Sequence, residues 1–383
     1  MRTVRAVVMG AGIVGIACAR ELALAGFAVT VVDRGGVAAA TTAHGEGNIL
    51  VSDKGPGPEL RLAQLSRRLW PELIAGSDAA EWEAKGGIVV ATTATGAGSL
   101  REFAADQRGA GVRAEPLDAK ALAEAEPHLT RDVTAAVHYP EDAQVQPAGA
   151  ATVLLAAARR AKATVRTGCE VRGAVTSAGR ITAVRTANEV LAADVFVNAA
   201  GPWAGELSRR LGAPVGVRPR RGEILVTTPL PPTVFHKVYD ADYVGAIGSD
   251  AQELQASAVV EATRAGPLLL GSSRRLAGFD DRLRPGVLSA IARRALRLFP
   301  CLTDVPVMRA YGGFRPYVAD HLPIIGADPR LPGLWHATGH EGAGIGLSAG
   351  TGRLLADLVT GRTPPIDAEP FRVDRPAAMA GGG

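Results

Sequence analysis

Three glycines near the start of the chain and one later carboxylate have the spacing that binds a dinucleotide. Gly10, Gly12 and Gly15 form the pattern G-x-G-x-x-G, and Asp33 follows about 20 residues later. The first glycine permits a tight turn, the second lets backbone N–H groups approach a pyrophosphate, and the third lets a helix pack closely on a strand. Asp33 would accept hydrogen bonds from the adenosine ribose, and its charge disfavours the 2′-phosphate of NADP. This pattern does not separate FAD from NAD.

The residues around these glycines predict the βαβ unit that such a site needs. Residues 4–9 form a short apolar run typical of a strand, and apolar residues then recur at helical spacing until Gly26. Residues 28–32 form a second apolar run that ends at Asp33. The helix N-terminus would carry the diphosphate, because its unpaired N–H groups and its dipole favour negative charge. A glycine-rich turn without a ligand is the structural alternative, and the matching strand, helix and carboxylate argue against it.

Four further motifs follow along the chain. The first two are Gly-Glu-Gly-Asn after His44 and Asp-Val-Phe-Val-Asn-Ala-Ala-Gly at 194–201. The third is Gly-Gly-Phe-Arg-Pro at 312–316, followed by Asp-His-Leu-Pro-Ile-Ile-Gly at 320–326. The fourth is Gly-His-Glu-Gly-Ala-Gly-Ile-Gly at 339–346. Taken together, the segments resemble the D-amino-acid oxidase family of FAD-dependent oxidoreductases, from about residue 4 to about residue 360. The last motif is most similar to the branch with D-hydroxyproline dehydrogenase, opine oxidase and the cyanide-forming glycine dehydrogenase. The resemblance selects FAD as the cofactor.

The resemblance also implies the fold class. The family combines a Rossmann-type FAD-binding domain, interleaved in an α/β fold, with an α+β substrate domain built on a large mixed sheet. Glycine-rich turns alternate along this chain with stretches that lack them, as that arrangement requires. The expected FAD-binding segments are residues 1–85, 140–215 and 310–370, and the expected substrate segments are 86–139 and 216–309. The remaining segment, 371–383, is expected to have nothing to pack against and to be mobile.

The residues that contact FAD follow from the same resemblance. The turn at 339–346 lies between an apolar run at 333–338 and a helical pattern at 347–359, so it creates a second helix N-terminus. Backbone N–H groups there would stabilise the negative charge of the reduced flavin. The expected cofactor-binding residues are Gly10, Gly12, Gly15, Asp33, Arg34, Thr41, Thr42, His44, Gly47, Asn48, Val171, Ala200, Gly201, Trp203, Gly313, Gly339, His340, Gly342, Gly344 and Ile345.

His44 allows three interpretations. In sarcosine oxidase the matching segment lies against the flavin, and in dimethylglycine dehydrogenase the matching histidine is covalently joined to it. A loop histidine hydrogen-bonded to the backbone is the structural alternative. We expect non-covalent contact with the flavin at His44, and covalent attachment stays open.

The expected catalytic residues are Arg315, Tyr243 and Glu341. Arg315 matches the arginine that holds the substrate carboxylate in glycine oxidase, and a planar guanidinium makes two parallel hydrogen bonds to such a group. Glu341 replaces a neutral or basic residue of glycine oxidase, so it would contact the substrate amine. Tyr243 and Tyr239 would orient the substrate or belong to the core, and Arg274 would approach the substrate or face water.

These residues predict oxidation of the C–N bond of a small amino or imino acid, by hydride transfer to flavin N5. The imine would hydrolyse to a 2-oxo acid or stay cyclic. Oxidation of a hydroxy acid or an N-methyl amine is the alternative. The electron acceptor stays open between oxygen, a partner subunit and a quinone.

Composition and spacing exclude other classes. Among 383 residues, 42 basic and 38 acidic side chains give a net charge of +4, and no basic run is long enough for a nucleic-acid footprint. No stretch reaches the roughly 18 apolar residues of a membrane span. Three scattered cysteines suit a reducing compartment, so we expect a cytoplasmic protein. We expect no metal site, since His336 and His340 lie in a strand-to-turn segment. Ser348 completes a G-x-S-x-G pattern, but no histidine follows it, which argues against a serine hydrolase.

Overall fold

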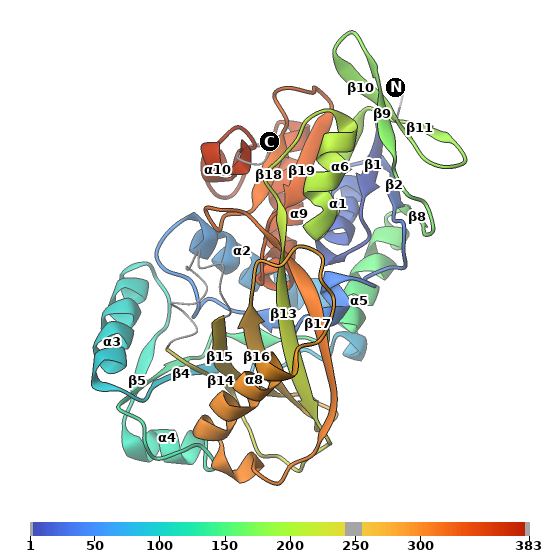
Figure 1. The fold of residues 1–383 in the computed structure, drawn as a ribbon. Helices are drawn as coiled ribbons and strands as arrows, with labels where there is room; N and C mark the ends of the chain where they lie inside the picture. The colour runs from blue at the N-terminus through green and yellow to red at the C-terminus, as the bar shows by residue number, and fades with distance from the viewer. Residues whose placement is uncertain (1–2, 242–254, 380–383) are drawn as a thin grey trace.

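The computed structural model describes residues 3–241 and 255–379, which form two large sheets in the upper and lower halves of Figure 1. The upper sheet has six strands in the order β18-β19-β12-β1-β2-β8. They are β1 (Arg5–Met9), β2 (Ala28–Val32), β8 (Thr164–Arg166), β12 (Val195–Asn198), β18 (Ile324–Ala327) and β19 (Leu334–Thr338). Strand β18 is antiparallel to β19, and the other neighbours are parallel. With α1 (Ile13–Leu24), β1 and β2 form the predicted βαβ unit.

Both faces of the six-stranded sheet are covered, which explains its uninterrupted apolar strands. In β1, Ala6 and Val8 pack in the cluster that contains residues of α1 and of α9 (Gly344–Thr360), while Val7 and Met9 pack against a small three-stranded sheet. The covering elements are α2 (Pro58–Ile74), α5 (Pro147–Arg160), α6 (Ala204–Leu211), α9 (Gly344–Thr360), β9 (Gly173–Ser177), β10 (Arg180–Arg185) and β11 (Val190–Ala192).

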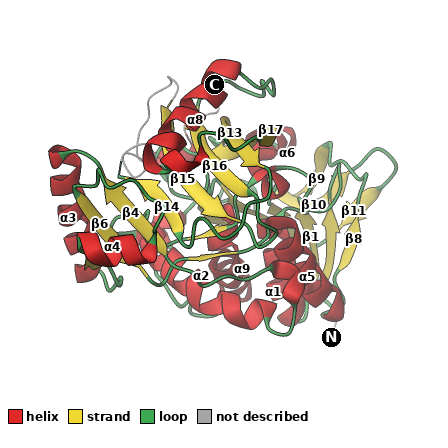
Figure 2. Ribbon diagram, turned by 90° about the horizontal axis from the view of Figure 1, so that it is seen from below, coloured by secondary structure: helices red, strands yellow, loops and turns green. Residues whose placement is uncertain are grey.

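The lower sheet has eight strands in the order β17-β13-β16-β15-β14-β4-β6-β5. They are β4 (Gly87–Ala91), β5 (Glu115–Leu117), β6 (Ala135–Tyr139), β13 (Arg218–Thr227), β14 (Lys237–Asp240), β15 (Gln255–Ala262), β16 (Leu268–Arg274) and β17 (Val307–Tyr317). Only β14 and β4 pair in parallel, so the sheet is mixed. Helix α8 (Pro285–Leu298) covers one face, opposite the side on which α1, α2 and α9 lie (Figure 2). The predicted fold class is confirmed.

The remaining elements are short or lie at the edge of the molecule. They are η1 (Thr41–His44), β3 (Asn48–Ile49), η2 (Asp78–Ala80), α3 (Ala94–Gly109), α4 (Ala119–Ala125), β7 (Ala143–Gln144), η3 (Gly201–Trp203), η4 (Pro300–Leu302), η5 (Glu369–Phe371) and α10 (Pro376–Met379). Across residues 3–241 and 255–379, no helix has both the length and the apolar character needed to cross a membrane.

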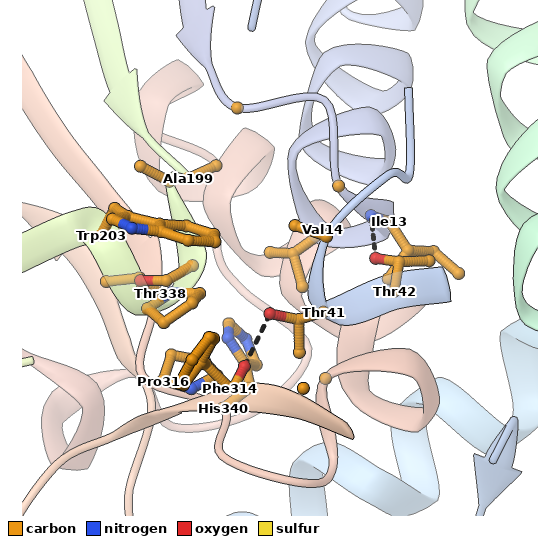
Figure 3. Close-up of a pocket in the computed structure, with 18 of the residues that line it drawn as sticks. Ile13, Val14, Thr41, Thr42, Ala199, Trp203, Phe314, Pro316, Thr338 and His340 are labelled. Carbon is orange, nitrogen blue, oxygen red and sulfur yellow. Dashed lines mark hydrogen bonds between the residues drawn. The ribbon is translucent and has the colours of Figure 1, made fainter. Parts of the chain in front are cut away.

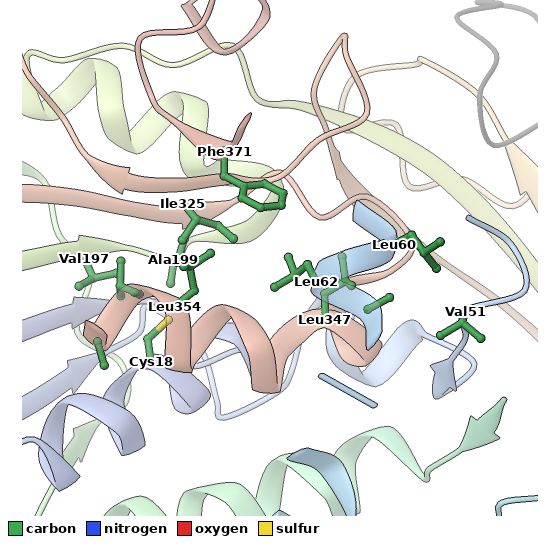
Figure 4. Packing of buried hydrophobic residues seen from close by; sticks show 14 of the residues in the cluster. Cys18, Val51, Leu60, Leu62, Val197, Ala199, Ile325, Leu347, Leu354 and Phe371 are labelled. Carbon is green, nitrogen blue, oxygen red and sulfur yellow. The ribbon is translucent and has the colours of Figure 1, made fainter. Parts of the chain in front are cut away.

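The C-terminal segment corrects one expectation. Residues 371–379 were expected to have nothing to pack against, yet Phe371, Val373 and Ala378 are buried. The ring of Phe371 lies beside Ile325 in the core, as Figure 4 shows. The backbone N–H of Gly216 donates to the carbonyl of Ala378 at 2.7 Å. The expectation that this segment has nothing to pack against is therefore wrong for residues 371–379, because three spaced apolar side chains are buried.

Candidate active site

A single crevice is lined by residues from both glycine-rich turns, although these turns lie more than three hundred residues apart in the sequence. Gly10 and Gly12 line it from the first turn, and Gly342 and Gly344 line it from the last. Figure 3 shows Ile13 and Val14 on one side, with Thr338 and His340 across from them. The crevice is therefore long enough to connect the start of α1 with the start of α9.

The first turn holds α1 close to β1 and leaves its N-terminus open. A side chain on Gly15 would place its Cβ 2.0 Å from the carbonyl oxygen of Gly10, so Gly15 serves helix packing and does not line the crevice. The N-cap residue Gly12 has no side-chain hydrogen bond to offer. The N–H of Ile13 donates to Oγ1 of Thr42 at 3.1 Å. The helix start can therefore hold an anion through backbone groups.

The crevice beyond β2 has features suited to an adenosine. The carboxylate of Asp33 accepts hydrogen bonds from the N–H groups of Ala11 and Gly35, both at 2.7 Å. The guanidinium of Arg34 lies 4.2 Å from the ring centroid of Trp203. Asp33, Arg34 and Trp203 all line the crevice. Each carboxylate oxygen of Asp33 can accept a further hydrogen bond, for example from a ribose hydroxyl.

The last turn creates the second helix N-terminus. Gly339 has a φ of +81°, and a Cβ there would lie 2.6 Å from Val318, so Gly339 shapes the turn without lining the crevice. Helix α9 begins without a side-chain N-cap. The ring of His340 is buried and is hydrogen-bonded through Nε2 to Thr351 at 2.9 Å. Burial lowers the pKa of His340 to about 3, so the ring is neutral near pH 7.

Most of the other predicted cofactor residues also meet in the crevice. Oγ1 of Thr41 donates to the carbonyl of Phe314 at 2.7 Å, which ties this loop to β17 (Figure 3). The predicted residues that line the crevice and are not described separately are Gly47, Asn48, Val171, Ala200, Gly201, Gly313 and Ile345. Among the predicted cofactor residues, only Gly15 and Gly339 do not line it.

Arg315 lies in the crevice on strand β17. Its guanidinium lies directly over Gly222 of β13, where a Cβ would come within 2.2 Å of Nη1. Nη1 donates to the carbonyl of Ser273 at 2.8 Å. The glycine clears the space and the carbonyl fixes the direction of the side chain. A planar cation is thereby held in place, and its geometry suits a carboxylate.

Both oxygens of Glu341 have donors within the protein. Oε1 accepts from Nη1 of Arg220 at 2.6 Å, and Oε2 accepts from Nδ1 of His321 at 2.9 Å. Burial alone raises the pKa of Glu341, but the His321 hydrogen bond and the charges of Arg274 and Arg220 outweigh it and lower the pKa below its usual value. Glu341 is therefore an anion that anchors neighbouring cations. Contact with a substrate amine stays a prediction. Arg274 is buried and does not face water.

One of the two tyrosines considered for the substrate site lies among the described residues. Tyr243 lies outside the described residues. Tyr239 is fully buried, and its hydroxyl donates to Oγ of Ser52, which in turn donates to the buried carboxylate of Asp142. The backbone N–H of Val51 also donates to Asp142 at 2.9 Å. Tyr239 therefore belongs to a core network.

His44 has the backbone hydrogen bond of its structural alternative, and its contact with the flavin stays a prediction. Its Nδ1 donates to the carbonyl of Ala40 at 2.7 Å, and its ring meets the edge of Tyr311 with centroids 5.9 Å apart. It also lines the crevice, where Gly313 makes room for it because a Cβ there would lie 2.8 Å from that of His44. Covalent attachment to the flavin stays a prediction.

Sequence reasoning missed several residues at this site. Gly222 and Glu46 line the crevice, and Lys237 and Glu261 form a buried cluster with Glu46. Glu46 could have been found from the sequence, because it is a charged residue inside the glycine-rich stretch after His44. Lys237 and Glu261 lie in ordinary strands, where no local pattern marks them.

The serine hydrolase alternative is wrong. Ser348 is fully buried within α9, and its hydroxyl donates to the carbonyl of Ile345 at 2.8 Å, as in an ordinary helix. A nucleophile would need an exposed hydroxyl on a strained turn.

Comparison with known proteins agrees with this geometry. Residues 5–358 match the family model DAO, described as FAD dependent oxidoreductase. The chain is 31% identical to glycine oxidase of Geobacillus kaustophilus over 388 residues, covering 98% of this chain and 97% of that protein. The crystal structure of glycine oxidase from Geobacillus kaustophilus superimposes with a TM-score of 0.87 at 28% identity, covering 97% of this chain and 99% of the other.

A longer relative matches over only part of its length. The bifunctional protein ThiO/ThiG of Nostoc sp. (strain PCC 7120 / SAG 25.82 / UTEX 2576) is 31% identical over 374 residues, which cover 92% of this chain and 52% of that protein. The chain thus spans about half the length of this relative.

The fold and the crevice define a dinucleotide-binding protein, since a carboxylate and the starts of two helices line one crevice. The chain belongs to the DAO family of FAD-dependent oxidoreductases, and its cofactor is FAD. The predicted family and cofactor are confirmed. The finer resemblance to the D-hydroxyproline dehydrogenase branch stays a prediction.

Proposed function

We propose that the protein oxidises the C–N bond of a small amino or imino acid. The observation that carries this proposal is Arg315, a fixed guanidinium that lines the cofactor crevice and lies over Gly222. The match along nearly the whole of a glycine oxidase supports the same substrate class. FAD, when bound, supplies the acceptor for the hydride and its two electrons. The imine product then hydrolyses to a 2-oxo acid, or stays cyclic if the substrate is proline-like.

The residues of the chain contribute binding and orientation. Arg315 holds the substrate carboxylate through two parallel hydrogen bonds, which fixes the direction of the Cα–H bond. With FAD bound, the start of α9 would offer backbone N–H groups to the negative charge that reduction creates. The buried, neutral ring of His340 fixes the turn without adding a charge. Glu341 keeps Arg220 in place beside the site.

Three finer points belong to the same proposal. The electron acceptor is oxygen, a partner subunit or a quinone, and we favour a dehydrogenase. Location in the cytoplasm suits the three free cysteines. A hydroxy acid or an N-methyl amine is the second candidate substrate, and Arg315 would bind the carboxylate of a hydroxy acid or of an N-methyl amino acid.

The test is to purify the chain, record its visible spectrum, and follow anaerobic bleaching of the flavin with D-, L- and N-alkylated amino acids and with 2-hydroxy acids. We expect bleaching by at least one amino or imino acid. Bleaching by hydroxy acids alone would move the protein to the other substrate class. Acid precipitation answers the question of His44, because a covalent flavin stays with the pellet.

A further inference from the structure

A buried polar cluster borders the crevice beside the eight-stranded sheet. Nζ of Lys237 donates to Oε2 of Glu261 at 2.7 Å and to Oδ1 of Asn48, and it lies 3.6 Å from Oε2 of Glu46. Nδ2 of Asn48 donates to the same oxygen of Glu46 at 2.9 Å. The ammonium group of Lys237 therefore faces two carboxylates.

Glu46 is the carboxylate of this cluster that lines the crevice. Its side chain is only 8% exposed, and among the described residues its Oε1 has no hydrogen-bond partner. Leaving a buried carboxylate oxygen without a donor costs free energy, so a ligand that brings a donor is favoured there. Burial raises the pKa of Glu261 to about 7, and the charge of Glu46 adds to the effect while Lys237 opposes it. Two carboxylates thus share the one ammonium group of Lys237.

Two glycines in the sheet beneath the crevice leave space for two oppositely charged side chains. A Cβ on Gly271 of β16 would lie 2.1 Å from Oε1 of Glu46, just as a Cβ on Gly222 of β13 would lie 2.2 Å from Nη1 of Arg315. Strands β13 and β16 are neighbours in the sheet. A carboxylate and a guanidinium therefore both line the crevice, each lying over a glycine of one of two adjacent strands.

We propose that Glu46 binds the amino group of the substrate while Arg315 binds its carboxylate, so that the crevice selects zwitterionic amino or imino acids. This inference rests on the proposed function and narrows it. An α-amino acid carries both charges on one carbon, and each finds the opposite charge at the site. A 2-hydroxy acid lacks the cation, so it would bring no charged donor to Oε1 of Glu46.

The test compares Glu46→Gln with the wild-type holoenzyme. The probes are the amino acid that bleaches the wild-type flavin fastest and propionate, a carboxylate without an amino group. We expect the variant to keep its flavin and to bind the amino acid about thirtyfold more weakly, because a charge pair is lost. Propionate, measured by its perturbation of the flavin spectrum, should bind both proteins equally. The proposal would be overturned if both proteins bound the amino acid with equal affinity. It would also be overturned if the variant lost the same factor of affinity for the amino acid and for propionate.

Two further variants keep the outcome interpretable. Glu46→Asp retains the charge and shortens the side chain, so its amino-acid affinity should fall between those of the wild type and Glu46→Gln; an affinity below that of Glu46→Gln counts against the proposal. Glu369→Gln, at an exposed site that pairs with Arg372, is the control for loss of a carboxylate. A wild type that no amino acid bleaches would instead overturn the proposed function, and the two failures are thereby distinct.

Discussion

The two turns that begin α1 and α9 share one architecture and differ in the side chains they carry. Each turn follows a strand of the six-stranded sheet and begins a helix without a side-chain N-cap. The two helices pack against each other, closely enough that a Cβ on Gly352 would meet the backbone of Ala17 at 2.8 Å. The first turn presents only backbone and small apolar groups, whereas the second carries the buried side chains of His340 and Glu341.

The difference indicates a division of work along the crevice. The first turn can hold any phosphate anion, because it acts through N–H groups. The second turn lies against the substrate side: a Cβ on Gly342 would be 3.5 Å from Nε of Arg315, and Glu341 pairs with Arg220. Changes near the second turn should therefore affect substrate binding, and changes in the first turn should affect the cofactor and the fold.

The largest expected effect is that of Arg315→Ala. Removing the guanidinium should raise KM for the amino acid by the equivalent of about 2 to 5 kcal/mol, because the substrate carboxylate loses a partly buried counter-charge. Flavin content should stay unchanged. Steady-state kinetics together with the absorbance spectrum measure both. Arg131→Ala, which removes an exposed guanidinium, is the control. An unchanged KM would remove Arg315 from the substrate site.

Gly15→Ala should affect the other end of the crevice. The new Cβ would meet the carbonyl oxygen of Gly10 at 2.0 Å, so α1 must move away from β1. Such overpacking costs about 1 to 3 kcal/mol of stability and should displace the diphosphate site, with loss of flavin. Gly98→Ala is the matched control, since nothing lies within 4 Å of its new Cβ in α3, and a gain of about 0.5 to 1 kcal/mol is expected. Thermal unfolding and flavin content distinguish the two variants. Full flavin content and unchanged stability in Gly15→Ala would contradict the packing role.

His340 should give the second turn a pH dependence that the first lacks. Its pKa in the folded protein, about 3, lies below the ordinary value of 6.5, because burial disfavours the charged ring. Between these values the unfolded chain binds the extra proton, so the contribution to stability is present above pH 6.5 and is lost as the pH falls. The slope is about 1.4 kcal/mol per pH unit.

Denaturant unfolding from pH 7 to pH 4 measures this slope. His340→Gln should unfold with a shallower pH dependence than the wild type over that range. His128→Gln, which removes an exposed histidine, is the control. Parallel curves for the wild type and His340→Gln would show that the ring titrates in the folded state.

The two turns also differ in how far the sequence predicts them. The first turn was predictable with its role, because strand β1, helix α1, strand β2 and Asp33 are contiguous and each has a local signal. The second turn was predictable as a helix N-terminus, but the partners of Glu341 were not. Arg220 lies 121 residues away on β13, and neither periodicity nor a motif marks it.

Distance along the sequence also explains why patterns in the sequence did not predict other contacts at the site. Glu46 meets Lys237 and Glu261 only because β14 and β15 pair beneath the loop that follows η1, so the contact depends on the assembled sheet. Tyr239 was considered for the substrate site, but its side chain lies in the core with Ser52. Short-range patterns thus predict backbone-built sites well, and they predict side-chain sites assembled across a sheet poorly.

Thr42→Val gives the smallest expected effect and tests the first turn alone. The substitution keeps the shape of a buried side chain and removes the oxygen that accepts the N–H of Ile13. A free N–H at the start of α1 should cost about 1 kcal/mol of stability, comparable to the loss of a helix cap. KM for the amino acid should not change, because this hydroxyl accepts its hydrogen bond at the start of α1. Chemical denaturation measures the first value and steady-state kinetics the second, with exposed Thr176→Val as the control. If Thr42→Val raised KM while leaving stability intact, the division of work between the two turns would fail.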